Sequence, residues 1–428
     1  MNAPAMKVPA QQMLDLLEEL AVFSAPGPGV SRLLYTPEWL KAQRFLQERM
    51  AALGMKVRTD GVGNVYGRIT GSQPAAKVIL TGSHMDTVLN GGKYDGAYGI
   101  AAAVTALHYL RQHFGQPLRT VEAVAFCEEE GSRFPLAYWG SGNVTGLYDG
   151  SEADSCADSA GVTIASAMAA CGLAGGPEDR GSAAVADSAG RDIPLREDIG
   201  AFVELHIEQG IVLEQAGLEI GIVEAIAGQR RYSVKVAGST NHAGTTPMGL
   251  RRDALAGAAE LLLAMEQAAA AAGDPLVATC GKLEAVPGTP NVIPGEVEFT
   301  LDIRHSEAVA LEHFCSRLLA AFEGIAAKRG LTLQFTVNLA TSPAPMNTGL
   351  NQQLEHIARQ QGRSFRSMVS GAGHDAQLFA PVCPTSMIFV PSRAGISHSP
   401  EEYSSPDELA AGLNLLTAIL YELAYKES

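Results

Sequence analysis

The segment K-V-I-L-T-G-S-H-M-D-T-V-L-N-G-G-K-Y-D-G, residues 77–96, decides the fold of this chain. It opens with the apolar run Val78–Leu80, which is typical of a strand buried on both faces of a sheet. His84 and Asp86 follow where that strand should end, and Asp95 comes after a Gly-Gly turn. Open α/β sheets bind ligands at the carboxyl ends of their strands, so these side chains are candidates for a site.

A histidine two residues before an aspartate has two interpretations. A metal-ligating imidazole usually donates its other N–H to a carboxylate, so His84 suits a ligand and Asp86 the group that orients it. Alternatively, the segment is a surface turn whose polar residues have no chemical role. This stretch alone leaves both interpretations open.

The next part of the chain extends the sheet. A helix is predicted over residues 97–110, and a second apolar strand, Thr120–Cys127, ends in three glutamates, Glu128–Glu130. Strand, helix and strand at this spacing predict an α/β fold with a mixed, mostly parallel sheet and helices on both faces.

The length and the charge of the chain limit its organisation and its partners. At 428 residues it is long enough for two domains. It carries 31 basic and 46 acidic residues, a formal net charge of −15. This charge repels phosphate backbones and anionic lipids, which argues against nucleic acid and membrane surfaces as partners. A local arginine cluster could still bind an anionic small molecule.

The cysteines and the first residues bear on the compartment. The six cysteines include no C-x-x-C pair, which fits reduced thiols better than a zinc ribbon or a disulfide framework. The first ten residues lack an apolar signal core, and no uncharged apolar run reaches the ~18 residues of a membrane span. We therefore expect a cytoplasmic protein.

We expect a discontinuous catalytic domain, residues 1–213 and 341–428, interrupted by an inserted domain at 214–340. The insertion reads β-α-β-β-α-β, the ferredoxin-like α+β order. The Ala-, Ser- and Gly-rich segment 151–198 has no assigned chemistry, and a mobile excursion is predicted over 175–190. The strands expected in the insertion are 233–236, 276–283, 296–303 and 331–337, and its helices 253–272 and 307–328. Elsewhere we expect helices at 9–22, 36–53, 163–171, 349–361 and 405–425, and strands at 55–58, 64–69, 201–210, 366–369 and 385–390.

Three consecutive glutamates after a buried strand are hard to explain by structure alone. Neighbouring carboxylates near a low-dielectric sheet repel one another unless one is protonated, exposed or beside a cation. For Glu128–Glu130 in isolation, a solvated acidic turn is the simpler interpretation. Their position after a strand that neighbours the one bearing His84 favours a metal site instead.

Further imidazoles come from three other segments. His206 lies near the end of the alternating strand 201–210, and His374 and His398 lie on the glycine-rich loops G-A-G-H and G-I-S-H. A lone histidine in a strand is more often structural, yet together these residues supply enough N and O ligands for two divalent ions, with Asp95 as a possible bridge. Such a set favours zinc or manganese over calcium or magnesium, and the lack of a thiolate argues against a structural zinc cage.

The inserted domain carries two more signals. His242 lies in the small-residue loop N-H-A-G-T-T-P-M, and Asn291 and Arg304 lie on the hairpin-like pair of strands. A chemical interpretation makes His242 an oxyanion donor and Arg304 a fork for a carboxylate. Spacing alone does not exclude solvent-facing turn residues.

Eight motifs occur in order between residues 82 and 400. They resemble those of the amidase/hydantoinase/carbamoylase family of dinuclear metallohydrolases, relatives of the aminoacylase-type metallopeptidases. Any one motif is moderately specific, whereas eight in order are very specific. The motifs are G-S-H-M-D-T-V, G-G-K-Y-D-G, E-E-E-G-S-R-F, E-L-H-I-E-Q-G, H-A-G-T-T-P-M, N-V-I-P-G, G-A-G-H-D-A-Q and I-S-H-S-P. Within the family, pieces such as Y-T-P-E-W-L and G-Q-R-R-Y look most like the members that act on allantoate.

The resemblance implies two divalent ions, zinc or manganese, and a role for each candidate residue. Asp95 would be shared between a metal bound by His84 and His206 and a metal bound by Glu130 and His398. Asp86 would orient His84, and Glu129 would be the general base and acid. The implied substrate-binding residues are Gln209, His242, Asn291, Arg304 and His374, and His242, Asn291 and Arg304 would reach the site from a partner subunit of a homodimer.

Two of these assignments depend on the family pattern. The choice of His398 over His374 as a ligand does not follow from spacing. The assignment of Glu129 rather than Glu128 as the base rests on Gly131, which follows the metal ligand in the motif.

The implied reaction is hydrolysis of the ureido C–N bond of allantoate, which releases ammonia and CO2 and leaves ureidoglycine or ureidoglycolate. Two metals would lower the pKa of a bridging water from 15.7 toward ~7, and Glu129 would pass its proton to the leaving nitrogen. The inserted domain would serve in dimerisation and as a lid. The alternatives are an N-carbamoyl-L-amino acid hydrolase or a β-ureidopropionase and, from another class, a non-catalytic binding protein that keeps the fold.

Overall fold

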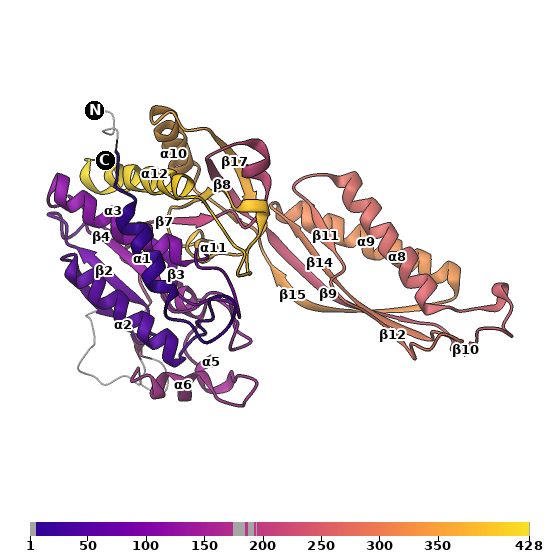
Figure 1. Cartoon of the computed structure of the whole chain (residues 1–428). Coiled ribbons are helices and arrows are strands. Elements are labelled where there is room, and N and C mark those ends of the chain that lie inside the picture. Colours follow the sequence, from indigo (N-terminus) through magenta and orange to yellow (C-terminus); the bar gives the residue numbers. More distant parts are fainter. Residues whose placement is uncertain (1–5, 174–184, 187–191, 194, 428) are drawn as a thin grey trace. The chain divides into compact units, whose positions relative to one another are not determined.

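The computed structural model describes residues 6–173, 185–186, 192–193 and 195–427 (Figure 1). The chain divides into two compact units: unit 1 comprises residues 1–224, 346–368 and 374–428, and unit 2 comprises 225–345 and 369–373. The expected domain boundaries, 213/214 and 340/341, lie nearby. The first falls later than expected because the chain still forms β8 (Ile220–Ile226), a strand of the larger sheet.

The excursion predicted at 175–190 lies outside the described residues, apart from 185–186.

The larger sheet has nine strands among the described residues, in the order β1-β2-β4-β3-β7-β18-β8-β16, with β17 paired to β8. The central strands β4, β3, β7 and β18 run parallel, and the pairs toward both edges are antiparallel. The mixed, mostly parallel sheet expected from the sequence is confirmed. Its other strands are β1 (Lys56–Thr59), β2 (Val65–Ile69), β3 (Val78–His84), β4 (Val121–Phe126), β7 (Ile199–Ile207), β16 (Ala344–Pro345), β17 (Phe365–Ser370) and β18 (Thr385–Val390).

The opening strand β3 is buried along its whole length, as its apolar run predicts. It pairs with β4 so that His84 lies beside Phe126, the last residue of that strand. In β18, Phe389 pairs with His206 of β7. The carboxyl ends of these parallel strands therefore meet at one edge of the sheet, where the polar motifs follow them.

Helices cover both faces of this sheet, and the alternation in β7 explains how. Val203, Leu205 and Ile207 join the core that includes α3 (Ala97–Phe114) and α12 (Pro406–Tyr425). On the opposite face, the Phe202 ring lies 4.3 Å from that of Phe379 in α11 (Ala376–Phe379). Glu204 and His206 share the second face and are also buried, so this strand has no solvent-exposed side.

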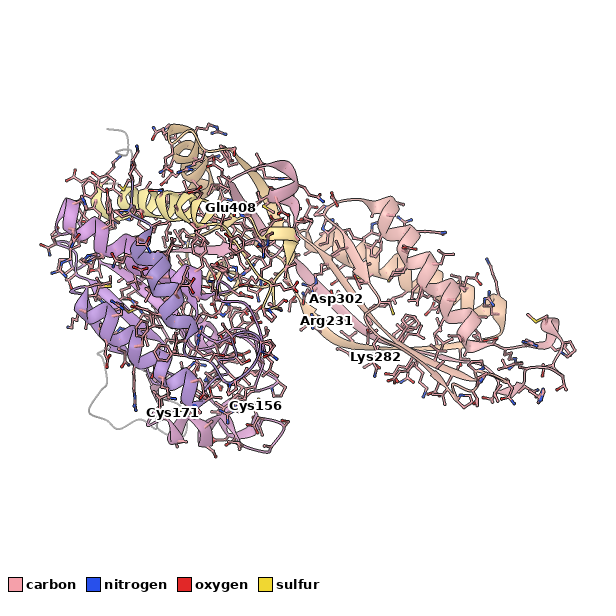
Figure 2. The ribbon with its side chains drawn as sticks, viewed as in Figure 1. Cys156, Cys171, Arg231, Lys282, Asp302 and Glu408 are labelled. Carbon is pink, nitrogen blue, oxygen red and sulfur yellow. The ribbon has the colours of Figure 1, made fainter. Side chains whose placement is uncertain are left out.

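Local sequence sets where the helices begin. The Thr36 hydroxyl accepts a hydrogen bond from the Trp39 N–H at the start of α2, with proline at the first helical position. The predicted capping box is present at α12, where Ser405 and Glu408 bond each other's backbone. Figure 2 labels Glu408 on this helix. The remaining helices of unit 1 are α1 (Gln11–Ala21), α2 (Pro37–Ala52), α4 (Trp139–Thr145), α5 (Glu152–Ser155), α6 (Ile164–Ala170), α7 (Val212–Ala216) and α10 (Thr348–Gln360).

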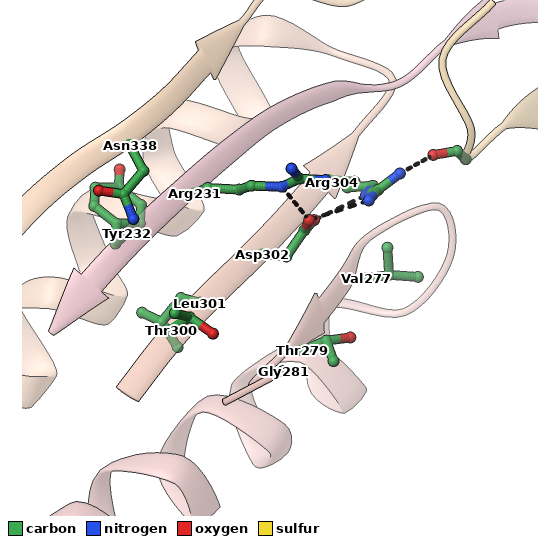
Figure 3. Close-up of a pocket in the computed structure, with 11 residues that line it drawn as sticks. Arg231, Tyr232, Val277, Thr279, Gly281, Thr300, Leu301, Asp302, Arg304 and Asn338 are labelled. Carbon is green, nitrogen blue, oxygen red and sulfur yellow. Dashed lines mark hydrogen bonds and ion pairs between the residues drawn. The ribbon is translucent and has the colours of Figure 1, made fainter. Parts of the chain in front are cut away.

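Unit 2 is an antiparallel sheet in the order β11-β14-β9-β15, with β12 also paired to β14 and two helices packed on one face. Its chain order, β9-α8-β11-β14-α9-β15, gives the ferredoxin-like arrangement. The opposite face of the sheet carries polar side chains, among them Arg231, Asp302 and Arg304 (Figure 3). The elements are β9 (Gly228–Ala237), α8 (Ala254–Ala272), β11 (Val277–Thr279), β12 (Leu283–Val286), β14 (Glu296–His305), α9 (Ala308–Arg329) and β15 (Thr332–Thr341).

The prediction of one strand in unit 2 was wrong. The segment 276–283 forms two strands, β11 and β12, and not one. The ladder with β14 is interrupted at residues 280–282, where the Lys282 N–H bonds the hydroxyl of Thr300 in place of a backbone carbonyl. A side-chain acceptor at this point takes the place of one ladder bond.

Helix α8 is long and apolar enough to cross a membrane by length and composition. Its sequence contains Glu260 and Glu266, however, and its inner side belongs to the core of unit 2 through Ala258, Leu261 and Met265. Packing against the sheet accounts for the apolar residues on that side.

Candidate metal centre

Asp95 is buried at the centre of a cluster of imidazoles and acids at the strand ends of unit 1, in which the His398 side chain is half-exposed. Its Oδ1 is 3.5 Å from His84 Nε2 and 3.2 Å from His206 Nε2. Its Oδ2 is 3.2 Å from His398 Nε2, which in turn lies 3.5 Å from Glu130 Oε1. The two oxygens of one carboxylate therefore face two different sets of ligand atoms.

Each member of the cluster comes from a different strand end or loop. His84 is the last residue of β3, His206 lies near the end of β7, and Glu130 follows β4. His398 and Gln209 lie on loops and have positive φ angles of 55° and 56°. Non-glycine residues rarely adopt this left-handed conformation, and such residues concentrate at functional sites.

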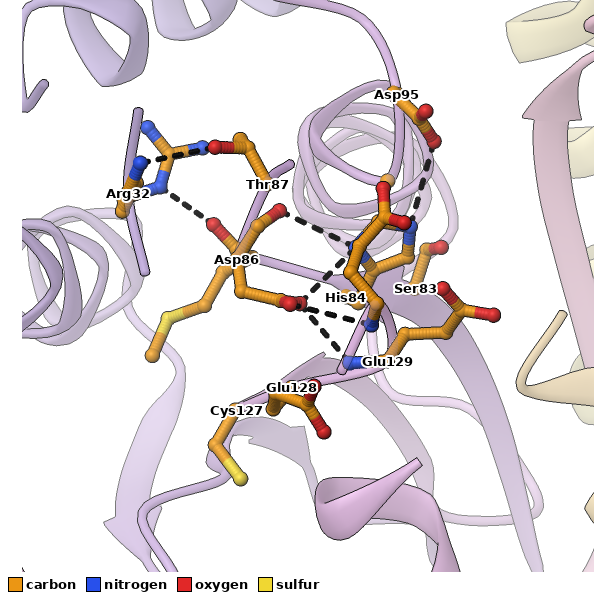
Figure 4. Close-up of polar contacts among 12 residues, drawn as sticks. Arg32, Ser83, His84, Asp86, Thr87, Asp95, Cys127, Glu128 and Glu129 are labelled. Atoms are coloured by element: carbon orange, nitrogen blue, oxygen red, sulfur yellow. Dashed lines mark hydrogen bonds and ion pairs between the residues drawn. The ribbon is translucent and has the colours of Figure 1, made fainter. Parts of the chain in front are cut away.

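Asp86 orients both the first histidine and the acidic loop. Its Oδ1 lies 3.2 Å from His84 Nδ1 and accepts a hydrogen bond from the Glu129 N–H at 3.0 Å, while Oδ2 accepts one from the Glu130 N–H at 3.3 Å (Figure 4). With Nδ1 engaged in this way, Nε2 of His84 points toward Asp95. A carboxylate that binds the far nitrogen of an imidazole fixes its tautomer and ring orientation.

The His206 ring is held similarly, by a backbone carbonyl. Its Nδ1 lies 2.9 Å from the Ile207 carbonyl oxygen, which can only accept a hydrogen bond, so the proton belongs on Nδ1. Nε2 lies 3.2 Å from Asp95 Oδ1 and 3.1 Å from the Gly96 nitrogen, and it is the nitrogen that would bind a metal. Both cluster histidines thus present Nε2 to Asp95.

The separations suit ligands of a shared cation. Two N or O ligands at ~2.0–2.1 Å from a tetrahedral zinc lie about 3.3 Å apart, and the contacts around Asp95 measure 3.2–3.5 Å. Among the residues that the structure describes, four groups of three side chains have ligand atoms within 4.8 Å of one another. They are His84/Asp95/His206, Asp95/Glu130/His398, His84/Glu129/Glu130 and Glu204/His206/His374.

The electrostatics of the cluster centre on Asp95. Burial opposes its ionisation, but hydrogen bonds from His206, His398 and His84 outweigh burial and hold the Asp95 pKa well below its ordinary value. The hydrogen bond to Asp95 raises the pKa of His398 to about 9. Asp95 is therefore ionised, as a bridging ligand must be.

The neighbouring acids show the opposite trend. Burial raises the pKa of Glu129 well above its ordinary range, and burial together with the Asp95 charge raises the pKa of Glu130 to about 7. Buried carboxylates this close together hold protons unless a cation replaces them. The site thus combines excess acid groups with little solvent, an environment that favours a divalent ion.

The three glutamates have distinct positions. The Glu128 carboxylate accepts hydrogen bonds from the Gly131 N–H and from the Trp139 N–H, the latter at 3.0 Å. Glu128 thereby closes the loop that follows β4. Glu129 has a carboxylate oxygen within ligand distance of His84 and Glu130. Of these two glutamates, Glu129 is the one whose carboxylate faces the cluster.

His374 lies apart from the Asp95 sets. It is buried, and its ring centroid is 4.6 Å from that of His206 and 5.4 Å from that of Phe389. Burial and the nearby His206 lower the His374 pKa well below its ordinary value. His374 is therefore neutral at physiological pH. Its ring nitrogen lies within 4.8 Å of possible ligand atoms of Glu204 and His206.

Sequence reasoning missed two residues of the cluster. The Ser397 hydroxyl, which has a single proton to donate, lies 3.2 Å from Asp95 Oδ2 and 3.0 Å from Glu402 Oε2. Gln209 Nε2, expected to bind substrate, also donates to Asp95 Oδ2, at 3.0 Å. Ser397 and Glu402 flank His398 in the sequence I-S-H-S-P-E-E, and their proximity to that histidine was the available signal.

Three expected site residues belong to unit 2. His242 and Asn291 are exposed and lie side by side, because β10 (Asn241–His242) pairs with β13 (Val292–Ile293) and the Ala243 N–H bonds the Asn291 carbonyl at 3.0 Å. Arg304 lies near the carboxyl end of β14, and the amino end of that strand follows directly after β13. At ~3.3 Å per residue, the strand from Glu296 to Arg304 spans roughly 26 Å. Unit 2 therefore brings His242 and Asn291 together and keeps Arg304 apart.

The chain is similar to several known proteins along its whole length. A model of "Peptidase family M20/M25/M40" matches residues 80–422. The chain is 47% identical, over 96% of its length and 97% of the relative's, to an allantoate amidohydrolase of Bacillus subtilis. It is 37% identical, over 97% of its length and 98% of the relative's, to an N-carbamoyl-L-amino-acid amidohydrolase of Paenarthrobacter aurescens. A crystal structure of an amidase of the hydantoinase/carbamoylase family from Burkholderia multivorans superposes with a TM-score of 0.92, at 33% identity, over 99% of this chain and 100% of that one.

Proposed function

Because the chain belongs to peptidase family M20/M25/M40, we propose that it is a metal-dependent amidohydrolase that cleaves the ureido C–N bond of allantoate. The family expected from the sequence motifs is confirmed. The observation that carries the proposal is the 47% identity to an allantoate amidohydrolase over nearly the full length of both chains. The products would be ammonia, CO2 and ureidoglycine or ureidoglycolate.

We propose two divalent ions, zinc or manganese, per subunit. His84, Asp95 and His206 would hold one, and Asp95, Glu130 and His398 the other. Support comes from the two ligand groups that share Asp95 and from the mixed imidazole-carboxylate donors without a thiolate. When bound, such ions polarise a carbonyl and lower the pKa of water from 15.7 toward ~7.

Glu129 would take the proton of the attacking water and deliver it to the leaving nitrogen. Its carboxylate lies beside His84 and Glu130, and its backbone N–H is anchored on Asp86. Asp86 thus fixes the ring of one ligand and the loop of the base together. Because one residue holds both, the position of the base is fixed relative to the metal ligands.

The substrate would contact Gln209, His374, His242, Asn291 and Arg304. His242 would stabilise the oxyanion, and Arg304 would bind the substrate carboxylate as a fork. The stretch of β14 from Glu296 to Arg304 spans roughly 26 Å and lies between Arg304 and the His242–Asn291 pair, so a small molecule such as allantoate cannot contact both in one copy. We therefore propose a homodimer in which one copy supplies His242 and Asn291 and the other supplies Arg304. This differs from the expectation stated above, in which one partner subunit supplies His242, Asn291 and Arg304 together.

We propose a cytoplasmic location. The six cysteines are all unpaired, and Cys127, Cys315 and Cys383 are buried thiols. Thiols stay reduced in the cytosol, where disulfides are rare.

The test is ammonia release by metal-reconstituted protein from allantoate and from N-carbamoyl-L-amino acids. We expect the higher kcat/KM with allantoate. A clear preference for N-carbamoyl-L-amino acids would instead favour a carbamoylase, which the relative at 37% identity exemplifies. Binding of allantoate without turnover, with an affinity unchanged by Glu129→Gln, would indicate a non-catalytic binding protein.

A further inference from the structure

We infer that Asp302 is a positioning residue that aims the guanidinium of Arg304 at the substrate carboxylate, with Arg231 as the counter-charge that keeps Asp302 from repelling that carboxylate. The inference rests on the proposed function in one respect, the role of Arg304 as the carboxylate fork.

Asp302 binds one edge of the Arg304 guanidinium with both oxygens. Its Oδ1 accepts from Arg304 Nε at 2.8 Å and its Oδ2 from Nη2 at 3.0 Å (Figure 3). Arg304 Nη1 donates to the Gly371 carbonyl at 2.6 Å. A guanidinium has five N–H groups, so these three bonds leave one N–H on each terminal nitrogen. Asp302 therefore fixes the side chain through its near edge and leaves two donors for an anion.

The register of two strands produces this arrangement. In the antiparallel pair of β14 and β9, Asp302 lies opposite Arg231, and Arg304 lies opposite Gln229. Residues two apart on a strand share a face, so all four side chains project from the side of the sheet opposite the helices. The four side chains come from two short motifs, L-D-I-R in β14 and Q-R-R in β9. We call these four residues the Arg304 cluster.

Gln229 restrains the plane of the guanidinium. With its amide oxygen turned toward Arg304, that oxygen lies 2.6–3.0 Å from all three guanidinium nitrogens. An in-plane acceptor can approach only two of the three, so the amide lies over the face of the group. The edge contact of Asp302 and the face contact of Gln229 together fix the direction and the plane of Arg304.

Arg231 balances the charge of Asp302. Its Nε donates to Asp302 Oδ2 at 2.7 Å, so one carboxylate lies between two guanidinium groups and the cluster keeps a net positive charge. Burial opposes ionisation of Asp302, but hydrogen bonds from Arg304 and Arg231 prevail and lower its pKa. An unpaired carboxylate beside the fork would repel an anionic substrate, whereas this one is neutralised.

The cluster borders a cavity of about 570 Å³ within unit 2, which Thr279, Thr300 and Asn338 also line. Small-molecule sites in proteins commonly have volumes of 300–1,000 Å³. The Arg304 and Asp302 side chains are each 25% exposed. The cavity therefore gives a small carboxylate access to the free donors of Arg304.

An ordinary surface ion pair is the alternative role for Asp302. The pair Lys235–Glu296 on the same two strands, with side chains 44% and 40% exposed, has that character. It provides the matched control, because Glu296→Gln removes a carboxylate from the same strand of the same sheet. If Asp302 only adds stability, then Asp302→Asn and Glu296→Gln should have the same kinetic effect.

The test is a double-mutant cycle on the metal-loaded full-length enzyme with allantoate as the substrate. Asp302→Asn should raise KM about tenfold, as loss of a charged hydrogen-bond partner typically does, and leave kcat within about twofold. In an Arg304→Ala background the same change should add less than about twofold, because Asp302 acts only through Arg304. Glu296→Gln should leave KM unchanged. An unaltered KM in Asp302→Asn, or an equal effect in both backgrounds, overturns the inference.

A second measurement separates this inference from the proposed function. Nuclear magnetic resonance with 15N-labelled arginine should show the Arg304 Nε–H of the wild type protected from solvent exchange, and Asp302→Asn should remove that protection while Glu296→Gln keeps it. If the wild type does not hydrolyse allantoate, the proposed function fails and the exchange result still decides the positioning role. Unprotected Nε–H in the wild type would overturn that role whatever the activity.

Discussion

Glu402 accepts a hydrogen bond from the backbone N–H of Asp95 at 3.1 Å, although the two residues are 307 positions apart. The same oxygen accepts the Tyr94 N–H at 2.9 Å, and the other oxygen accepts the Ser397 hydroxyl. Glu402 therefore joins the loop that carries Asp95 to the loop that carries His398. These are the two segments that the second proposed metal would connect.

Removing Glu402 should weaken metal binding. Groups that support metal ligands typically contribute 10–100-fold in affinity, so Glu402→Ala should lose metal to a chelator at a roughly 10–100-fold lower chelator concentration. Glu402→Gln, which keeps one acceptor oxygen, should retain most of the affinity. Metal content after chelator competition measures both, and the exposed neighbour Glu401→Gln is the control. Wild-type retention in Glu402→Ala would contradict the supporting role.

Glu129→Gln should abolish most turnover and leave the metal bound. A positioned general base typically contributes 10²–10⁴-fold, so kcat should fall by about that factor. Glutamine preserves the size of the side chain and the backbone bond to Asp86, so metal content and thermal stability should remain near the wild type. Ammonia release with metal analysis of the same sample checks this. A fully active Gln variant would remove Glu129 from its role as base.

Chelation should both inactivate and destabilise the protein. The cluster brings several carboxylates together in a buried site, so a cation that binds only the folded state adds stability in proportion to its affinity and concentration. We expect a lower Tm after dialysis against a chelator, and restoration of Tm and activity by zinc or manganese but not by magnesium. Equal restoration by magnesium would argue against the assigned ligand preference.

Two inactive variants should complement each other if copies exchange residues. In a refolded equimolar mixture of His242→Ala and Glu129→Gln, half of the dimers are mixed. Each mixed dimer has one site with an intact Glu129 and a partner's intact His242. The expected activity is roughly a quarter of the wild type. Activity no higher than that of the separate variants would show that His242 acts in its own copy.

The ion pairs of Asp302 predict a pH dependence of stability. Its pKa is lowered below the ordinary 3.8 by Arg304 and Arg231 despite burial. For an acid with a depressed folded pKa, the stabilisation is complete above the unfolded pKa and is lost as pH falls through the folded one. Wild type should therefore resist urea better than Asp302→Asn at pH 6, and the difference should vanish at a pH below the folded pKa. A difference that persists under acid would contradict the pairing.

Local patterns predicted most of the secondary structure of the chain. The apolar run before His84 identified a buried strand, and Thr36-Pro37 and Ser405-Pro406 identified helix starts, because caps depend on a few adjacent atoms. The segment 276–283 was misjudged because the break between its two strands depends on the Thr300 hydroxyl of a neighbouring strand. A side chain from another strand leaves no mark in the local sequence.

The sequence by itself determined most of the order of the strands and helices, the family and the set of candidate ligands, since periodicity and motif spacing are properties of the linear chain. Only the tertiary structure decided that Glu128 turns into its own loop while Glu129 faces His84, that Glu402 supports Asp95, and that Arg304 lies far from His242. Contacts of this kind depend on the register of strands and the paths of loops from distant parts of the chain, which are fixed when the core packs.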